Sequence, residues 1–240
     1  MNSSIASSLS TRSLLLALIL GLLPFGGIAR AQQSNSGSIG LNFAAENNDQ
    51  THLSPDTEAG YKSVDQKHWN NLIGPEGKNK ELTDSKGKVI NGMNVSWAVP
   101  GADQNWRSTV GRDWGFKDGN LTLQLGYIQL GAVLKIQDIP YEKYDVYVYV
   151  GAGDNAGEGS VTLSASNKQQ LDPNGTYFYK LGWLNGKYQI SEATSLEANQ
   201  LGNVVVFKGN SAPDVVLEWA GNLKGGWTGV TGIQIVASKK

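Results

Sequence analysis

Residues Tyr144–Val150 read YDVYVYV, a strict alternation that decides the fold class. The three valines lie on one side of an extended segment, and Asp145, Tyr147 and Tyr149 lie on the other. A period of two recurs in most of the other segments that we expect to be strands. The expected strands are Ser38–Phe43, Met93–Val99, Ala132–Ile139, Tyr144–Val150, Ser160–Ser164, Thr176–Trp183, Tyr188–Ala193, Asn203–Phe207, Asp214–Trp219 and Thr228–Ala237.

Turns rich in Gly, Asn, Asp and Pro separate these segments, as at Asp172–Gly175 and Gly209–Pro213. Short strands with close turns exclude alternating strand–helix architecture. They predict an all-β fold: a two-sheet antiparallel β-sandwich that is jelly-roll-like. We expect at most one short helix, near residues 63–72, where Ser63 and Gln66 occupy the two polar positions of a capping box. Pro100–Asn120 shows no periodicity and is expected to be a long loop.

The first residues have the organisation of an export signal. Arg12 supplies a basic start, Leu14–Leu23 is a short apolar run, and Ala29 and Ala31 form a small-x-small cleavage signal before Gln32. We therefore expect a secreted or periplasmic protein. No second apolar stretch follows, so no transmembrane anchor is expected. The predicted organisation is a signal peptide (1–31), a disordered N-terminal segment (32–37) and a single sandwich domain (38–238).

Composition excludes several classes of function. The chain has 20 basic and 21 acidic residues, and the expected signal removes two arginines and no acid. The mature chain would therefore have 18 basic and 21 acidic residues, a net charge of −3. Such a mild, mixed charge does not suggest a nucleic-acid partner. The absence of Cys excludes thiolate metal sites, thiol nucleophiles and disulfides. The 30 glycines, 7 tryptophans and 9 tyrosines fit a β-sandwich with many tight turns.

The spacing of the histidines, serines and acidic residues indicates neither a metal site nor a catalytic nucleophile. His52 and His68 show no ligand pattern such as HxxxH, and are expected to be solvated or to satisfy loops. Ser36–Gly40 lacks the first glycine of a nucleophile elbow and enters a strand, so we reject it. Asp154, Asn155 and Glu158 offer oxygens to Ca²⁺, but they lack the alternating acids of calcium loops, and turn chemistry is preferred. We expect no cofactor and no metal.

A polysaccharide hydrolase would need two carboxylates facing one cleft, about 5 to 10 Å apart. Acids on the polar face of a strand are usually solvated, so we expect a non-enzymatic protein. The carboxylates available for such a pair are Asp103, Asp113, Asp145, Asp154, Glu158 and Glu218.

Aromatic residues offer a stronger signal. Trp106, Trp114 and Trp227 lie in polar or glycine-rich surroundings, where a flat ring can stack on a pyranose while polar side chains take its hydroxyls. The residues that we expect to bind a ligand are Trp106, Arg107, Arg112, Asp113, Trp114 and Trp227. The alternative is that these rings close the ends of the sandwich. A second aromatic stripe, from Tyr177 to Trp183, is better explained as core.

Several motifs carry a resemblance to a known group of proteins. They are SIGLNF (38–43), WNNL (69–72), YDVYVYV (144–150), NVVVF (203–207) and GVTGIQIV (229–236). The chain resembles secreted bacterial β-sandwich proteins, a largely uncharacterised group that often carries a C-terminal sorting tail. The resemblance implies a fold similar to the galactose-binding-like jelly roll and implies no catalytic residues. The sequence ends just after the last expected strand, so we expect no sorting tail in this chain.

The sequence thus predicts an exported, non-catalytic module that binds a glycan or another extracellular polymer through aromatic side chains. A structural or interaction protein of the cell envelope or matrix is the first alternative. A polysaccharide-acting hydrolase with paired carboxylates is the second.

Overall fold

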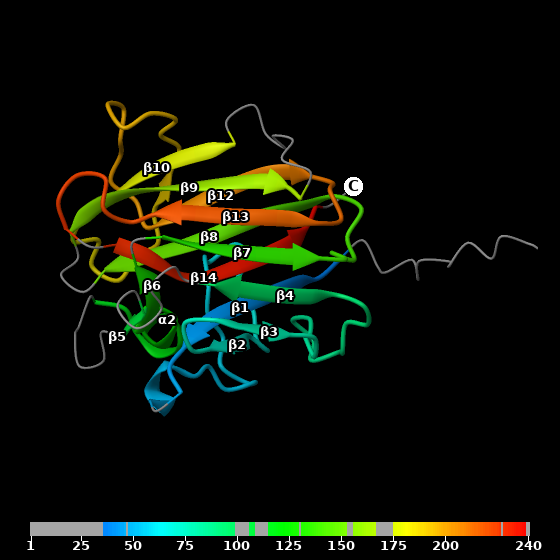
Figure 1. Ribbon diagram of the computed structural model, residues 1–240. Helices are drawn as coiled ribbons and strands as arrows, with labels where there is room; N and C mark the ends of the chain where they lie inside the picture. Colours follow the sequence, from blue (N-terminus) through cyan, green and yellow to red (C-terminus); the bar gives the residue numbers. More distant parts are fainter. Residues whose placement is uncertain are drawn as a thin grey trace, which may run out of the picture. The chain divides into compact units, whose positions relative to one another are not determined.

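Two β-sheets make up the fold in the computed structural model (Figure 1). The structure describes residues 36–46, 48–98, 106–108, 115–129, 131–152, 156–166, 175–226 and 228–238, with only the backbone for 106–108, Gln129 and Ala152. The strands are β1 Ser38–Ala44, β2 Asn70–Ile73, β3 Gly77–Asn79, β4 Asn94–Ala98, β5 Trp106–Ser108, β6 Gly126–Gln129, β7 Gly131–Gln137, β8 Tyr144–Ala152, β9 Gly157–Ala165, β10 Thr176–Leu181, β11 Ile190–Ser191, β12 Val204–Asn210, β13 Val215–Ala220 and β14 Thr228–Ala237.

The larger sheet has eight strands in the order β11-β12-β8-β14-β1-β2, with β6 pairing to β14 and β5 to β6. The smaller sheet has six strands in the order β10-β9-β13-β7-β4-β3. Pairing is antiparallel except between β1 and β2 and between β11 and β12. From β7 onward the chain alternates between the sheets, apart from the β9–β10 and β11–β12 pairs. The all-β sandwich expected from the alternation is therefore confirmed.

The main core lies between the sheets. The alternation of β8 directs Val146, Val148 and Val150 inward, and none of the three has exposed surface. Across the interior, the rings of Phe43 on β1 and Trp219 on β13 lie 6.0 Å apart. Fully burying a side chain of this size contributes about 1.5–3 kcal/mol, so packing of this layer stabilises the fold in a chain without disulfides.

A second apolar cluster covers the outer side of the eight-stranded sheet, which we call the covered face. Its buried members are Leu53, Ala59, Trp69, Leu123, Tyr149, Val204 and Val206. The ring of Tyr149 lies 5.8 Å from that of Trp69 and 5.0 Å from that of Tyr188. The Tyr149 hydroxyl donates to Gln234 Oε1 at 2.7 Å and accepts from the Tyr61 backbone N–H at 2.8 Å. These contacts hold the segments that contain Tyr61, Trp69 and Tyr188 against the outer side of the sheet.

This cover changes the expected burial of β1. The alternation of Ser38–Phe43 predicts a half-buried strand, but all seven residues of β1 are buried. The reason is that the Trp69 ring lies on Gly40, where an added Cβ would come within 2.6 Å of the indole. Both sides of β1 therefore face apolar layers.

The helix expected near residues 63–72 is wrong. Gln66 instead forms a β-bridge with Ala59, and the end of the expected helix becomes strand β2. The Trp69 indole Nε1 donates to the backbone oxygens of Ala59 and Gln66. Two helical turns are marginal on their own, so these tertiary contacts prevail over the capping signal.

The short helix is α2, Asp118–Leu123, within and just after the expected long loop. Its Gly119 approaches the Glu58 backbone so closely that a Cβ would lie 2.2 Å from the Glu58 oxygen, and its Leu123 is buried in the covered face. A 3-10 turn, η1, spans Asp49–Thr51. Among the residues that the structure describes, no helix has the length and apolarity needed to cross a membrane.

Candidate functional site

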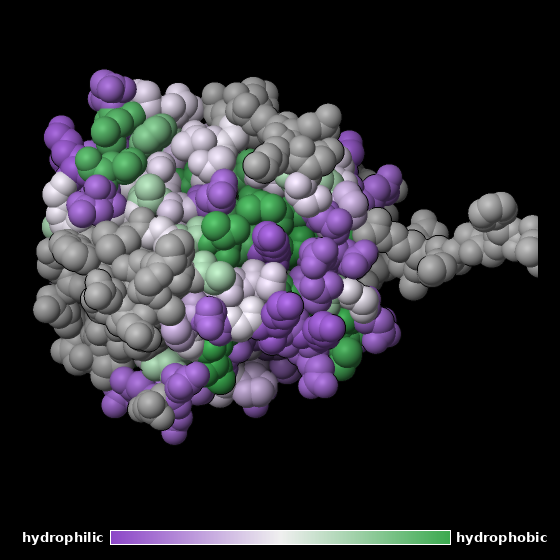
Figure 2. Space-filling model, viewed as in Figure 1, coloured by the Kyte–Doolittle hydropathy of each residue, from purple (hydrophilic) through white to green (hydrophobic). Residues whose placement is uncertain are grey.

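The outer side of the six-stranded sheet differs from the covered face, and we call it the bare face. Apart from Glu158, its outward side chains all keep some exposed surface. They are mostly small, hydroxylated or charged: Lys78, Asn94, Ser96, Ala98, Val133, Lys135, Gln137, Ser160, Thr162, Ser164, Thr176, Phe178, Lys180, Val216, Glu218 and Ala220. Figure 2 shows apolar side chains near the middle of this view, with hydrophilic ones beside them.

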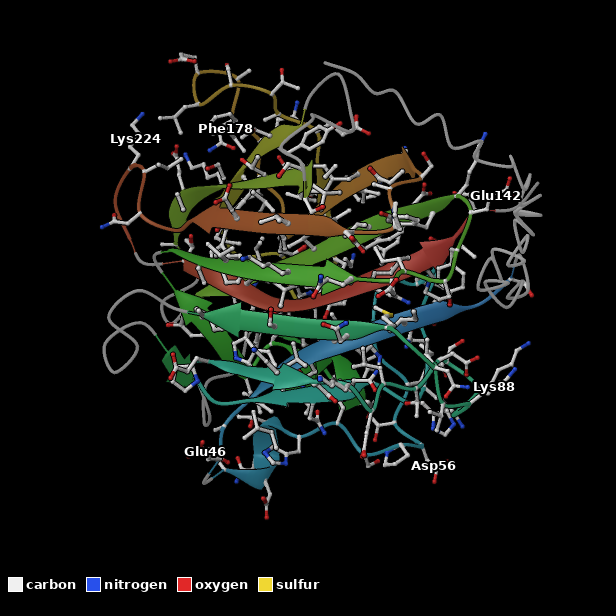
Figure 3. The ribbon with its side chains drawn as sticks, turned by 45° about the vertical axis from the view of Figure 1, so that its right-hand side comes forward. Glu46, Asp56, Lys88, Glu142, Phe178 and Lys224 are labelled. Carbon is white, nitrogen blue, oxygen red and sulfur yellow. The ribbon has the colours of Figure 1, made fainter. Side chains whose placement is uncertain are left out.

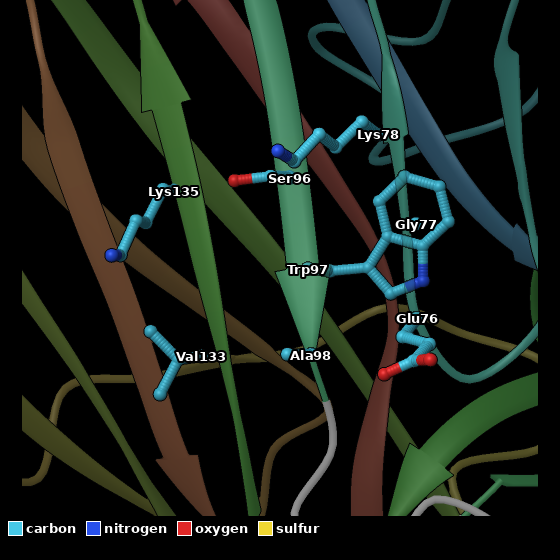
Figure 4. A pocket seen from close by; sticks show the side chains of 8 residues that line it. All are labelled: Glu76, Gly77, Lys78, Ser96, Trp97, Ala98, Val133 and Lys135. Carbon is cyan, nitrogen blue, oxygen red and sulfur yellow. The ribbon is translucent and has the colours of Figure 1, made fainter.

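A shallow hollow with a volume of about 650 Å³ lies on the bare face. Strands β3, β4 and β7 supply most of its lining, and Glu76 lies just before β3. The lining residues are Glu76, Gly77, Lys78, Ser96, Trp97, Ala98, Val133 and Lys135 (Figure 4). The register sets Lys78 opposite Ser96, and Ser96 opposite Lys135. The next row along the strands pairs Ala98 with Val133. One part of the hollow is therefore polar and another apolar.

The Trp97 indole forms one side of the hollow and is held rigidly. Its Nε1 donates to the Gly74 oxygen at 3.0 Å, and the ring lies on Gly77, where a Cβ would come within 2.7 Å of it. Only 6% of Trp97 is exposed, so it offers the edge of its ring and not a whole stacking face. The hollow can accept a ligand that has both apolar C–H surface and hydroxyl groups.

The structure leaves the predicted loop site largely untested. Trp106 and Arg107 have a described backbone in β5, which pairs with β6, but their side chains lie outside the described residues. Arg112, Asp113, Trp114 and Trp227 also lie outside them, as do Ala29, Ala31 and Gln32 of the expected cleavage signal.

Chain neighbours of two of these tryptophans are described. Gly115 follows Trp114 and packs on Asn185 and Gly186, while Gly226 precedes Trp227 and packs on Ala156 and Gly157. Gly157 is in turn paired with Leu181 at the end of β10. The Gly226 contact is therefore at the end of the sheet where β9 begins and β10 ends, and Asn185 and Gly186 follow the end of β10 by four and five residues in the chain.

At this end Trp183 is 59% exposed, whereas Trp69, Trp97 and Trp219 are 6% exposed or less. The expected stripe from Tyr177 to Trp183 is core only as far as Leu181, because β10 ends there. Two other large apolar side chains are exposed nearby: Leu201, which packs on Gly182, and Leu223, whose backbone N–H donates to Glu158. We call Trp183, Leu201 and Leu223 the end patch; Figure 3 marks Lys224, beside Leu223 in the chain, at this end.

The described candidate carboxylates do not form a catalytic pair. Glu218 lies opposite Thr162 of the neighbouring strand, and Glu158 is four residues before Thr162, so the backbone positions of the two glutamates are about 14 Å apart. Asp145 is on the other sheet and accepts from the Gly209 N–H. Asp103, Asp113 and Asp154 lie outside the described residues.

Neither histidine belongs to a metal cluster among the described residues. His52 Nε2 lies 2.6 Å from the Ala45 oxygen and therefore donates to it, which is the loop-satisfying role expected. Of the residues considered for Ca²⁺, Asp154 and Asn155 are outside the described set. Glu158 accepts from Asn199 Nδ2 and lies 3.8 Å from the Lys180 ammonium.

Comparisons with known proteins give only distant likenesses. No protein-family model matches the sequence, and no curated protein matches it. Among solved structures, the chain is similar to the CBM36-1 domain of a multidomain xylanase from the hindgut metagenome of Trinervitermes trinervoides, at 13% identity and TM-score 0.30, covering 48% of this chain and 82% of that one. It is also similar to the K2 cleaved adhesin domain of Lys-gingipain, at 12% identity and TM-score 0.30, covering 59% and 88%. At these scores neither likeness bears on what this chain binds.

The residues of the hollow were not predicted as a site. The alternation of Met93–Val99 places Ser96 and Ala98 opposite Trp97, and that of Ala132–Ile139 sets Val133 and Lys135 on one side. Which side stays open depends on what covers each sheet, and no local pattern carries that information.

Proposed function

We propose that this protein is an exported, non-catalytic module that binds carbohydrate or another extracellular polymer in the hollow of the bare face. The observation that carries the proposal is the contrast in exposure between the two outer faces. One is largely covered by a second apolar cluster, and the other keeps its side chains accessible around a hollow of about 650 Å³. A long polymer needs an open, amphipathic surface, and the bare face supplies one.

The absence of catalysis is supported by the charged groups that the structure describes. Glu218 and Glu158 are too far apart for glycoside hydrolysis, and Glu158 is engaged by Lys180 and Asn199. We also expect the module to work without a metal. Thermal unfolding and polymer binding should therefore be unchanged by EDTA or by added Ca²⁺.

Export belongs to the same proposal. The signal at residues 1–31 should be removed so that the mature chain begins at Gln32 in the periplasm or outside the cell. Mass spectrometry of the N-terminal peptide from fractionated cells tests this. A mature chain that still carries residues 1–31, recovered from the cytoplasm, would refute export.

A matched pair of serines tests the binding site. Ser96 lines the hollow, whereas Ser160 lies on the same face on β9, opposite Ala220 and Phe178. The mature protein is first screened on a glycan array, and the ligands found are titrated by calorimetry. Ser96→Leu should fill the hollow and weaken binding at least tenfold, while Ser160→Leu should leave it unchanged. No binding to any glycan, or equal losses in both variants, would reject the proposal.

A second candidate function is favoured by the end patch. Trp183, Leu201 and Leu223 expose 59%, 38% and 40% of their surfaces at one end of the sheet, as expected of a protein-contact surface in the cell envelope or matrix. This alternative predicts a cross-linked protein partner that is lost in Trp183→Ser and unaffected by added glycan. Cross-linking that gives the same products with and without Trp183 would rule it out.

A further inference from the structure

The charges around the hollow carry an inference about which polymers it selects. Lys78 and Lys135 flank Ser96 in one row across β3, β4 and β7, on the same side of the sheet. Neighbouring strands are about 4.8 Å apart, so the attachment points of the two lysines are about 10 Å apart. Both side chains are exposed, and a single ligand on Ser96 would lie between them.

Neither lysine has a carboxylate partner within the described part of the chain. The salt bridge described on this sheet joins Lys180 to Glu158 at 3.8 Å, near the β10 edge. The acid nearest to Lys135 by register is Glu218, which lies opposite Val133 and diagonally from Lys135 across β7 and β13, where backbone positions are about 7–8 Å apart. No ion pair joins Glu218 to Lys135 among the described residues. The two ammonium groups are therefore available to a ligand.

Glu76 is the acidic member of the lining, and its place limits its effect on the lysine row. In Figure 4 its carboxylate lies on the far side of the Trp97 ring from the Lys78 ammonium, while Lys78 extends toward Ser96. The charged lining thus comprises two cations on the Ser96 side and one anion beyond the indole. A lysine ammonium group attracts an anionic ligand most strongly where no carboxylate of the protein lies close to it.

We infer that the hollow selects polymers with acidic groups, such as uronic-acid glycans, whose carboxylates contact Lys78 and Lys135 while the sugar ring lies against Val133, Ala98 and the edge of Trp97. This inference rests on the proposed function and names the substrate class of the same site. The lining contains no arginine, whose guanidinium group can bind a carboxylate through two parallel hydrogen bonds. The lysine ammonium groups act instead as point charges, so binding is sensitive to salt.

Polygalacturonate and its methyl ester provide the test, because they share a backbone and differ in charge. At pH 7 and low salt, the mature protein should bind polygalacturonate at least tenfold more tightly than the ester, and added salt should reduce the difference. An exposed ion pair contributes about 0.2–1 kcal/mol, so each of Lys78→Gln and Lys135→Gln should weaken binding by a factor of roughly 1.4 to 5. Together they should remove most of the preference.

Lys88→Gln is the matched control, since Lys88 is exposed in a turn outside the hollow and its loss changes the net charge equally. It should retain the preference. Equal affinity for the two polymers, or equal losses in Lys78→Gln and Lys88→Gln, would overturn the inference while leaving carbohydrate binding in place. Binding of neutral array glycans without binding of polygalacturonate would overturn it as well. Failure to bind any glycan would reject the proposed function itself.

Discussion

The two outer faces of the sandwich are formed by strands with similar alternation, but they differ in exposure. One face is covered by other segments of the chain, and the other remains accessible. On the covered face, Trp69 and Tyr188 each pack edge to face against Tyr149. Hydrogen bonds join Tyr149 to the Tyr61 backbone and Trp69 to the Ala59 backbone. On the bare face, most of the corresponding outward positions are polar or small residues that keep some exposed surface; Glu158 is buried, and Phe178 is the one aromatic residue among the outward positions that the structure describes. Aromatic residues in the strands of this protein therefore mark burial, and the surface available to a ligand is the one with few of them.

This contrast separates stability from binding. Substitutions on the covered face should destabilise the protein, because they open a packed layer. Substitutions on the bare face should leave the fold almost unchanged and alter only what it binds. The following predictions test that separation.

The largest effect is expected from a pair of tryptophans. Trp69 is 4% exposed and packs against Tyr149 and Gly40, so Trp69→Ala should reduce the free energy of unfolding by about 3–5 kcal/mol. Trp183 is 59% exposed, and Trp183→Ala should cost less than about 1 kcal/mol. Urea titrations of the mature protein compare the two. Similar costs would show that the covered face does not stabilise the fold.

A pair of glycines should give the next largest effect. In Gly40→Ala the new methyl would come within 2.6 Å of the Trp69 ring, inside the sealed layer, which should cost about 1–3 kcal/mol. In Gly77→Ala the methyl would come within 2.7 Å of Trp97, but β3 is a three-residue edge strand that can shift. Its cost should be smaller, and polymer affinity should fall because Trp97 moves. A larger stability loss for Gly77→Ala than for Gly40→Ala would contradict this account.

Alkaline pH should weaken the covered face. Burial raises the pKa of Tyr149 well above its ordinary value of 10, so above pH 10 the unfolded chain loses this proton before the folded one does. Stability is then full below pH 10 and falls as pH rises further, by about 1.4 kcal/mol per pH unit for each such tyrosine. Tyr149→Phe should be less stable at pH 8 yet lose stability less steeply between pH 10 and 11. Unfolding curves with equal slopes for the two proteins would count against this explanation.

The smallest effect is expected on the bare face. The Thr162 and Thr176 hydroxyl oxygens lie 2.8 Å apart on β9 and β10, where both residues are partly exposed. Thr162→Val should change the free energy of unfolding by no more than about 0.5 kcal/mol. A loss above about 1.5 kcal/mol in a urea titration would indicate that this face is packed against something.

Much of the fold follows from local pattern. The expected strand Thr228–Ala237 is β14 with the same bounds, and Tyr144–Val150 lies within β8 with its valines in the core. These segments were predictable because alternation and β-branched residues act within each strand. The helix was not, because Asp118–Leu123 is short, contains Gly119 and has no side-chain cap. Tertiary contacts through Leu123 hold it in place.

The candidate site was less predictable because it too depends on contacts between segments that are distant in sequence. Alternation identifies two sides of a strand, and on β8 it sets Tyr147 and Tyr149 on the side opposite the core valines, without indicating whether that side is covered. Tyr149 is fully buried there, because segments distant in sequence cover it. Conversely, Ser96 and Lys135 carry no motif, and they form a site only through the register of β4 with β7. The tryptophans at 106, 114 and 227 stay a prediction.

Amide chemical-shift mapping of the mature protein with a soluble acidic glycan would show which outer face binds the ligand. Binding in the hollow should concentrate the shifts at residues 76–78, 96–98 and 133–135, with little change at residues 59–69 and 188–206. Shifts confined to those latter segments, or to the end patch, would contradict it.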